Sequence, residues 1–591
     1  MPFGKRPLLT VLFGCLATLA IATAPTPLWD EDEARFAAVA RGMVESGDWV
    51  VPRFNGTLAV DKPVLMHWCM AACMTLFGVN EFAARLPSMI ATLLTALALF
   101  RAGRRWCDET TGAVAAMAYV GCLLVSIEAH AATPDAILTA LTTWATLLLA
   151  EAVMPGPDGR LRTASSATAA MAGALMGLAV VCKGPIGLVG PLAVVGCWTW
   201  WLALRSRAAA GPAPAPHPVR AALAAGLDAV RVLRPAVLMA AAIAAAVPWY
   251  AAVTIRTEGA WTTGFFMVHN VGRFMAPMEK HSGGVLFHPL VMLVGFYPWS
   301  CFLPLAVVVA AWRVAKGTAG GVGGDAIRLA LVWLVIWVGG FSAAATKLPN
   351  YVLPAYPAAA LLVAVMAVMA VMAVMTVEAA RRAAAGWPHP RWMATGLGSL
   401  VFGGVATVAT VLVTSRHGLP GAEPAAAVGL IPLVGAAACG LLAVRRPLGA
   451  VAAFAVTGLA YAALAVGPAQ TLLATANTLP RFVEEMQRGR PEVRLGTYLV
   501  SSPNVVFYAR HPVAQFAAGS EAAVAGFLRS APEAVLLVPE EHFAAVEQAL
   551  PPGFGIVARS RPAFRTDDLL AVGRLPAAEP RTAQLDEEPR R

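Results

Sequence analysis

The sequence predicts a mainly α-helical polytopic membrane protein with about 13 transmembrane helices, external juxtamembrane amphipathic helices and a small carboxyl-terminal α/β domain. Of the 591 residues, 58% are hydrophobic and only 13% are charged, which is more apolar surface than a soluble core can hide. Apolar runs of about 20 residues recur along the chain. Arginine and lysine residues gather in every second connection between these runs, as they do in cytoplasmic loops.

Composition excludes several other classes of protein. The formal charge of +10 follows from basic cytoplasmic loops, and no soluble basic stripe with interleaved aromatic residues indicates nucleic-acid binding. The nine cysteines contain no CxxC pair, so neither a zinc site nor a disulfide framework is indicated.

The first apolar run, residues 8–28, follows Lys5 and Arg6 and is long enough to span a membrane. A signal peptide is the alternative, but small residues suited to cleavage occur only around Ala22–Ala24. We therefore expect an uncleaved first helix with a cytoplasmic amino end.

Residues 29–68 carry too many charges to cross the membrane and are expected to lie outside it. Four acids open a helical pattern, then a break at Ser46–Asp48, a short extended run and a turn at Asn55–Gly56 lead to Asp61-Lys62-Pro63. The pattern predicts an amphipathic helix on the membrane surface. Its apolar face holds Phe36, Val39, Ala40, Met43 and Val44, and its polar face holds Arg35, Arg41 and Glu45.

Twelve further apolar runs follow, and alternating them from a cytoplasmic start places the arginine-rich connections on one side and exports the carboxyl end. Two external loops, residues 29–82 and 254–286, are long, and we expect them to cap one cavity. The runs are 83–101, 111–128, 135–153, 167–182, 185–204, 235–253, 287–312, 327–345, 352–376, 393–414, 425–444 and 448–467.

The expected domains are a transmembrane domain at 1–468, a periplasmic α/β domain at 469–577 and a disordered tail at 578–591. Within the second, runs at 496–500, 505–508 and 535–538 read as strands, and 521–529 and 541–550 read as helices.

Two acids are candidates for chemistry at the external face. Asp32 lies in the opening turn of a helix, where the helix dipole favours its charge and neighbouring acids oppose it. Asp135 follows Thr133-Pro134, which reads as a helix opening with Thr133 as the cap. A solvated helix start and simple capping are the alternatives, but both acids are expected on the same face of the membrane.

Four basic residues in external loops could bind an anion there. Each alone could be a lysine or arginine reaching toward the headgroups, but together they favour a phosphate attached to a lipid. They are Lys62, Lys183, Arg273 and Lys347. The spacing of His269, His281 and His288 matches no metal-ligand pattern.

Several motifs resemble membrane glycosyltransferases of the GT-C class, and most closely the group that holds lipid A 4-amino-4-deoxy-L-arabinose transferases and bacterial relatives of dolichyl-phosphate-mannose protein O-mannosyltransferases. The first external loop carries WDEDEARFAAVARGMVESGDWVVPRFNG, DKPVLMHW and FGVNEFAARLPS. TPD, KGP and KLPNYVLPAYP then follow in the expected order, so the resemblance covers roughly residues 10–360.

The resemblance implies an enzyme that moves a sugar from undecaprenyl (polyprenyl) phosphate to an acceptor at the periplasmic face of the inner membrane. It makes Asp32 and Asp135 the catalytic candidates, with Glu33 and Lys183 in support. Lys62, Arg273, Lys347 and Tyr351 match positions expected near the donor phosphate, Arg273 less securely than the others.

The sugar and the acceptor are left open by the resemblance, because Met66-His67-Trp68 stands where aminoarabinose transferases more often have Gly-Tyr-Trp. Lipid A, another glycolipid or a protein could accept the sugar at the outer face of the membrane, whose lipids surround the protein. The resemblance specifies no cofactor, and dependence on a divalent cation is left open.

Two other functions are alternatives to an enzyme. A transporter or flippase of lipid-linked sugars explains the spans and the basic site equally well, but such proteins tend to have inverted repeats and ionisable groups at mid-membrane. A structural subunit leaves the first loop unexplained.

Overall fold

The computed structural model describes residues 7–21, 26–28, 31–156, 159–209, 218–272, 283–381, 391–417, 422–467, 471, 479–488, 493–500, 503–531, 533–561 and 568–575. The chain forms two compact units. The membrane unit comprises Met1–Thr26 and Val39–Leu473, and the carboxyl-terminal unit comprises Pro27–Ala38 and Ala474–Arg591. Arg273 and the tail at 578–591 lie outside the described residues.

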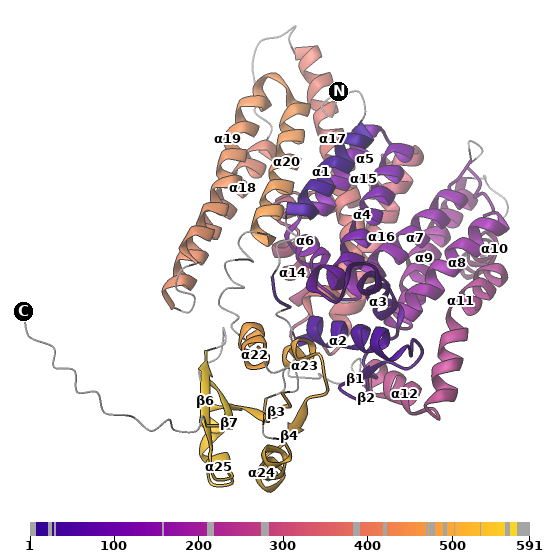
Figure 1. Ribbon diagram of the computed structural model, residues 1–591. Coiled ribbons are helices and arrows are strands. Elements are labelled where there is room, and N and C mark those ends of the chain that lie inside the picture. The colour runs from indigo at the N-terminus through magenta and orange to yellow at the C-terminus, as the bar shows by residue number, and fades with distance from the viewer. Residues whose placement is uncertain are drawn as a thin grey trace, which may run out of the picture. The chain divides into compact units, whose positions relative to one another are not determined.

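The membrane unit is a multi-pass helical bundle, which confirms the predicted fold class (Figure 1). In the described part of the chain, 10 helices are long and apolar enough to cross a membrane, or 11 if one bent pair counts as a span. The ten lie in α4 (Glu81–Trp106), α7 (Asp135–Val153), α8 (Ser166–Lys183), α9 (Ile186–Ala209), α11 (Pro235–Arg256), α16 (Gly321–Ala343), η3 with α17 (Pro349–Ala355 and Tyr356–Arg381), α18 (Arg391–His417), η4 with α19 (Glu423–Gly429 and Leu430–Arg445) and α20 (Pro447–Val466).

The other apolar runs form shorter or broken helices, so the count of spans depends on how breaks are treated. The run at 111–128 is bent by 67° between α5 (Glu109–Val120) and α6 (Leu123–Ala129). The run at 287–312 is interrupted, because the chain passes from α14 (Phe287–Gly295) through η2 (Trp299–Cys301) into α15 (Leu303–Ala315). The remaining elements of this unit are α1 (Pro7–Ile21), α3 (Leu65–Phe77), α10 (Pro218–Val232), α12 (Ala260–Thr263) and η1 (Gly264–Gly272).

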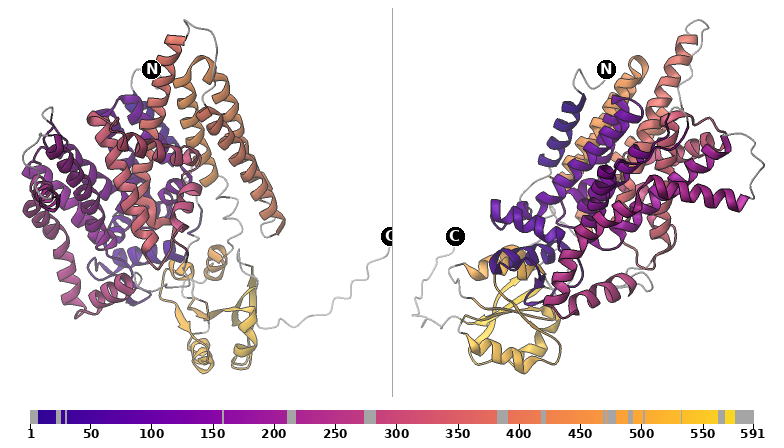
Figure 2. Two further views of the ribbon diagram at one scale, coloured as in Figure 1. Left: turned by 180° about the vertical axis from the view of Figure 1, so that it is seen from behind. Right: turned by 90° about the vertical axis from the view of Figure 1, so that its right-hand side faces the viewer.

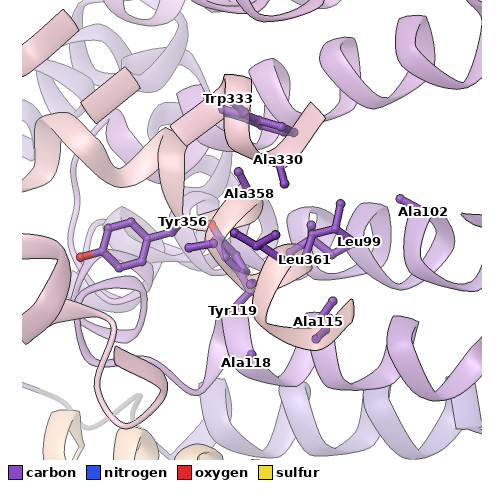
Figure 3. Packing of buried hydrophobic residues seen from close by; sticks show 14 of the residues in the cluster. Leu99, Ala102, Ala115, Ala118, Tyr119, Ala330, Trp333, Tyr356, Ala358 and Leu361 are labelled. Carbon is purple, nitrogen blue, oxygen red and sulfur yellow. The ribbon is translucent and has the colours of Figure 1, made fainter. Parts of the chain in front are cut away.

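The core of the bundle forms where α4, α5, α16 and α17 meet. Alanines and larger side chains from all four helices pack together there (Figure 3). Trp333 and Tyr356 are almost fully buried there, and the Trp333 indole donates to the Pro354 carbonyl at 2.8 Å. This pairing satisfies the one polar group of the indole in an apolar surrounding.

Helices α8 and α11 cross closely because α8 presents glycine at the crossing. A Cβ atom at Gly173 would lie 2.1 Å from the Leu238 carbonyl oxygen, and one at Gly177 would lie 2.4 Å from that of Ala242. Glycines four residues apart let two membrane helices approach backbone to backbone. The crossing fixes α8, whose last residue is Lys183.

The first external loop begins with α2 (Glu31–Ser46), which confirms the predicted helix. Phe36, Val39 and Met43 are buried as expected, but Arg41 is also buried, although it was predicted to be solvated. It pairs with Glu45 at 3.3 Å, one turn later. The helix passes from one unit to the other between residues 38 and 39.

A hairpin and tryptophans fix the rest of that loop within the membrane unit. Strands β1 (Arg53–Phe54) and β2 (Thr57–Leu58) join through Asn55 and Gly56, whose φ angles of 49° and 83° suit the predicted turn. The indoles of Trp249 and Trp261 donate to the carbonyls of Val50 and Ala59 at 3.0 and 2.7 Å. Helix α11, through Trp249, and the second long loop, through Trp261, therefore hold the first loop.

The carboxyl-terminal unit contains a five-stranded mixed sheet of order β4-β3-β5-β7-β6. Strands β4, β3 and β5 are parallel, while β7 is antiparallel to β5 and β6. Figure 2 shows this sheet edge-on with its helices. The elements are α22 (Leu479–Gln487), β3 (Leu495–Tyr498), α23 (Pro503–Ala509), β4 (Ala514–Phe516), α24 (Glu521–Ser530), β5 (Val535–Pro539), η5 (Glu540–His542), α25 (Phe543–Glu547), β6 (Phe554–Ser560) and β7 (Leu569–Arg574).

The strand prediction at 505–508 is wrong, because these residues lie in α23. Val505, Val506, Phe507 and Tyr508 are buried on every side, and a short apolar run with no periodicity fits a buried helix as well as a strand. Strands β4, β6 and β7 were not predicted.

Candidate functional site

Lysine, acid and aromatic side chains from distant segments line one cavity of about 200 Å³ in the membrane unit. Both long loops that were predicted to be external contribute to it, Asp61 and Lys62 from the first and Phe265 and His269 from the second, so the two loops line one cavity as expected. The other lining residues are Leu138, Lys183, Ile186, Phe341, Ala344, Thr346 and Tyr351.

Behind this cavity, Asp135 forms a buried ion pair with Lys183. Asp135 Oδ1 accepts from Lys183 Nζ, and Asp135 Oδ2 accepts from Asn350 Nδ2 at 3.1 Å. The Lys183 ammonium also lies 5.1 Å from the centre of the Tyr351 ring, within cation–π range. Asp135 is thus held by two donors, while Lys183 and Tyr351 reach the cavity wall.

Asp135 and Lys183 each lie at the end of a helix, and the two helix ends bring them together. Asp135 is the first residue of α7, and Lys183 is the last residue of α8. Gly184 ends α8 with a φ of 85°, a conformation that glycine adopts most readily. The predicted Thr133 cap is wrong, because the Thr133 hydroxyl donates to Glu128 Oε2 at 2.9 Å instead. The Thr133 hydroxyl thereby joins α6 to the turn before α7.

Lys62 reaches the cavity from the end of the hairpin. Its Nζ donates to the Asp61 carbonyl at 3.3 Å, and the side chain is half-buried. Upstream, Asp48 accepts from the amides of Val50 and Val51 at 3.0 and 3.2 Å and from Arg256 Nη1 at 2.7 Å. Partial burial opposes the charge on Asp48, but these donors outweigh it and lower the pKa of the carboxyl.

Lys347 is buried beside the cavity rather than in its lining. Its ammonium donates to the carbonyls of Phe341 and Ser342 at 3.1 and 2.6 Å, near the carboxyl end of α16. A cation at this position is favoured by the helix dipole. Nearby, a ring nitrogen of His288 lies 3.2 Å from the Leu348 carbonyl oxygen.

Asp32 and Glu33 lie in the first turns of α2, in the segment that belongs to the carboxyl-terminal unit. Asp32 is exposed and Glu33 is buried. The same segment is fixed to that unit by the Leu28 amide, which donates to the Tyr508 hydroxyl at 2.9 Å. That Asp32 and Asp135 serve one site stays a prediction.

Three residues in or beside the cavity were not chosen as site residues from the sequence. Asn350 stands between Lys347 and Tyr351 in the KLPNYVLP motif, so its position already indicated it. Asp61 precedes the lysine that was chosen, and His269 was considered only as a metal ligand.

His67, at the departure from the aminoarabinose pattern, is buried in α3, and burial lowers its pKa to about 4.

No three His, Cys, Asp or Glu side chains converge as a metal site among the residues that the structure describes. All nine cysteines are free thiols.

Comparison with known proteins gives relatives of one kind. The dolichyl-phosphate-mannose-protein mannosyltransferase family matches residues 61–215. The undecaprenyl phosphate-α-4-amino-4-deoxy-L-arabinose arabinosyl transferase of Shewanella sediminis is 29% identical over 339 residues, which are 57% of this chain and 55% of that protein. The protein of the same name from Erwinia tasmaniensis is 28% identical over 421 residues, 71% of this chain and 67% of that protein.

A solved structure extends the likeness to nearly the whole chain. The crystal structure of ArnT from Cupriavidus metallidurans bound to undecaprenyl phosphate superposes with a TM-score of 0.77 over 96% of this chain and 98% of that one, at 21% identity. The chain has the ArnT fold. The fold that the resemblance implied is thereby confirmed, and at 21% identity this likeness to ArnT concerns the fold alone.

Proposed function

We propose that this protein is a glycosyltransferase that moves a sugar from undecaprenyl phosphate to lipid A or another envelope glycolipid at the periplasmic face of the inner membrane. One observation carries the proposal: Lys62, Lys183 and Tyr351 converge on a cavity beneath both external loops. The names of the relatives and the ligand of the ArnT crystal structure support undecaprenyl phosphate as the substrate of this cavity.

Charge determines which residues meet the donor phosphate. The described acids Asp61 and Asp135 offset Lys62 and Lys183, so the cavity by itself carries little net charge. We therefore assign Arg273 and Lys347 as additional cations for the phosphate. Two of the three N–H donors of Lys347 already meet carbonyls, which holds its ammonium in place.

The proposed reaction is a single displacement with inversion at the anomeric carbon. The bond from that carbon to the phosphate oxygen breaks, the bond to the acceptor oxygen forms, and undecaprenyl phosphate leaves. Lys62 stabilises the leaving phosphate, which needs little protonation. Asp32 accepts a proton from the acceptor, or orients it, and Glu33 supports Asp32. Asp135 positions Lys183.

Transfer to a protein acceptor is the second candidate. The match to protein mannosyltransferases over residues 61–215 favours it, since that range includes Asp61, Lys62, Asp135 and Lys183. A lipid acceptor remains the first choice because the longer alignments are with arabinosyl transferases.

An assay with radiolabelled undecaprenyl-phosphate sugars tests the proposal. Purified protein is offered lipid A or membrane protein as acceptor, and only an enzyme forms a covalent product, whereas a flippase does not. The Asp32→Asn variant should lose transfer by about 10²–10⁴-fold, the usual contribution of a general base. Glu258→Gln, an exposed acid at the start of the second loop, is the control. Substantial transfer by Asp32→Asn would remove Asp32 from its role.

A further inference from the structure

A second cavity, apolar and also of about 200 Å³, lies among five other helices of the membrane unit. Helices α15, α17, α18, α19 and α20 each contribute side chains, with Trp299 of η2 at one end. Helices α18, α19 and α20 run side by side in Figures 1 and 2. The lining contains no charged residue, and none of its residues lines the cavity that holds Lys62.

The cavity reaches the exposed surface of the helical bundle at Leu305. This side chain lines the cavity and is nevertheless 47% exposed, whereas Ala306 beside it is buried. An apolar cavity gains nothing from water, because water finds no hydrogen-bond partners there. A hydrocarbon chain from the bilayer is the available occupant that restores the missing dispersion contacts.

Two arginines lie one helical turn beyond the lining. On α15, Leu305, Val309 and Arg313 follow one another at intervals of four residues, so they share a face. On α20, Arg446 caps the helix and precedes the lining residue Ala450 by four. Both arginines are placed where the cavity meets one end of the bundle.

The Arg313 guanidinium makes a weak hydrogen bond, so it can bind a stronger hydrogen-bond acceptor. Its Nη1 donates to the thioether sulfur of Met369 at 3.3 Å, and sulfur of this kind is a weak acceptor. Met369 lies one turn after Met366, which lines the cavity. The guanidinium of Arg313, a residue of α15, is therefore held against α17 beside the cavity.

We propose that this cavity binds an anionic phospholipid, with an acyl chain among the five helices and the phosphate between Arg313 and Arg446. The lipid comes from the leaflet at which α15 ends and α20 begins. Basic residues between membrane helices recognise anionic headgroups through charge and hydrogen bonds. The site is separate from the proposed transfer reaction, so either proposal can fail without the other.

Native mass spectrometry of the full-length protein tests this site. The protein is titrated with phosphatidylglycerol or with zwitterionic phosphatidylcholine of the same chains. We expect at least tenfold stronger retention of phosphatidylglycerol, and loss of that preference in the Arg313→Gln/Arg446→Gln variant. Arg220→Gln, an exposed arginine on α10, is the charge control. Equal preference in the double variant and the wild type would overturn the headgroup assignment.

Filling the cavity tests the acyl-chain half of the proposal. Ala306→Phe should weaken retention of both lipids, while Val308→Phe, on the 65% exposed face of the same helix, should not. Equal retention by both variants would overturn the assignment of the chain to this cavity.

A measurement on the wild type guards against a variant that fails to fold. Cys439 lines the cavity, so phosphatidylglycerol should slow its modification by N-ethylmaleimide, read at the peptide level. Exposed Cys197 serves as the internal control. An unchanged rate at Cys439 would count against the site.

Discussion

At the scale of single residues, Asp135 has partners that distinguish its possible roles. The sequence allows a helix cap, a catalytic acid, or a group that positions the acceptor or a neighbouring lysine, and the Asp135 carboxylate is enclosed by Lys183 and Asn350. A buried ion pair adds little net stability, but removing one partner leaves an uncompensated charge. We therefore predict that Asp135 acts on the cavity through Lys183.

Substitution of this pair should give non-additive losses. Asp135→Asn and Lys183→Met should each lower the free energy of unfolding by about 3–5 kcal/mol, because the remaining charge is left buried. The double variant should recover much of that stability without recovering sugar transfer. Thermal unfolding in detergent and the transfer assay measure the two effects. Additive losses of stability would show that the two side chains act independently.

The lowered pKa of Asp48 predicts that the stability of the first loop depends on pH. Because its donors lower the pKa of Asp48 below the ordinary 3.8, the stabilisation is complete above that value and is lost as pH falls through the lower, folded-state pKa. Pepsin cleavage between residues 47 and 62, normalised to an unfolded substrate, should therefore rise as the medium becomes more acidic.

Two variants separate Asp48 from general acid unfolding. Asp48→Asn should expose the loop at every pH and abolish its own pH response, while Glu45→Gln should retain the response. A response that is the same in Asp48→Asn and the wild type would assign the acid sensitivity to other groups.

At the scale of elements, glycine placement determines where the helices cross. Gly173 and Gly177 lie four residues apart in α8 and meet the backbone of α11 with no room for a methyl group. The spacing of the two glycines can be read from the sequence, but the sequence does not show which helix packs against them. The same crossing holds the helix that ends in Lys183, so packing far from the cavity positions a cavity residue.

Alanine at this crossing should separate the two helices. Gly173→Ala places its methyl group 2.1 Å from the Leu238 carbonyl oxygen, and overpacking of this kind costs about 1–3 kcal/mol of stability. Gly196→Ala is the matched control, since a Cβ atom there meets nothing within 4 Å. Apparent melting temperatures of the two variants give the comparison, and equal values would contradict the close crossing.

At the scale of the whole molecule, the division into two units assigns the catalytic candidates to different parts of the chain. Asp32 belongs to a segment that folds with the carboxyl-terminal unit, and Lys62, Asp135 and Lys183 belong to the membrane unit. The proposed reaction requires both sets on one side of the membrane.

Thiol labelling of single-cysteine variants tests that requirement. We expect cysteine at Thr57 or Glu258 to react with a membrane-impermeant maleimide from the periplasmic side, because both lie in external loops. The exposed native Cys107 should be protected there, since it follows the arginine-rich end of α4. Labelling of Cys107 together with the two loop positions would contradict the topology and the proposed site.

The sequence by itself determined the membrane class, the helical periodicity, the Asn55–Gly56 turn and the membership of Lys62 and Tyr351 in the cavity. These follow from local composition and from motifs, which a linear chain carries. Only the tertiary structure decided that Lys183 neutralises Asp135, that Arg41 is buried, that residues 505–508 form a helix and that residues 27–38 fold with the carboxyl-terminal unit. Each of these depends on contacts between residues far apart in the chain, and their energies do not appear in any local pattern.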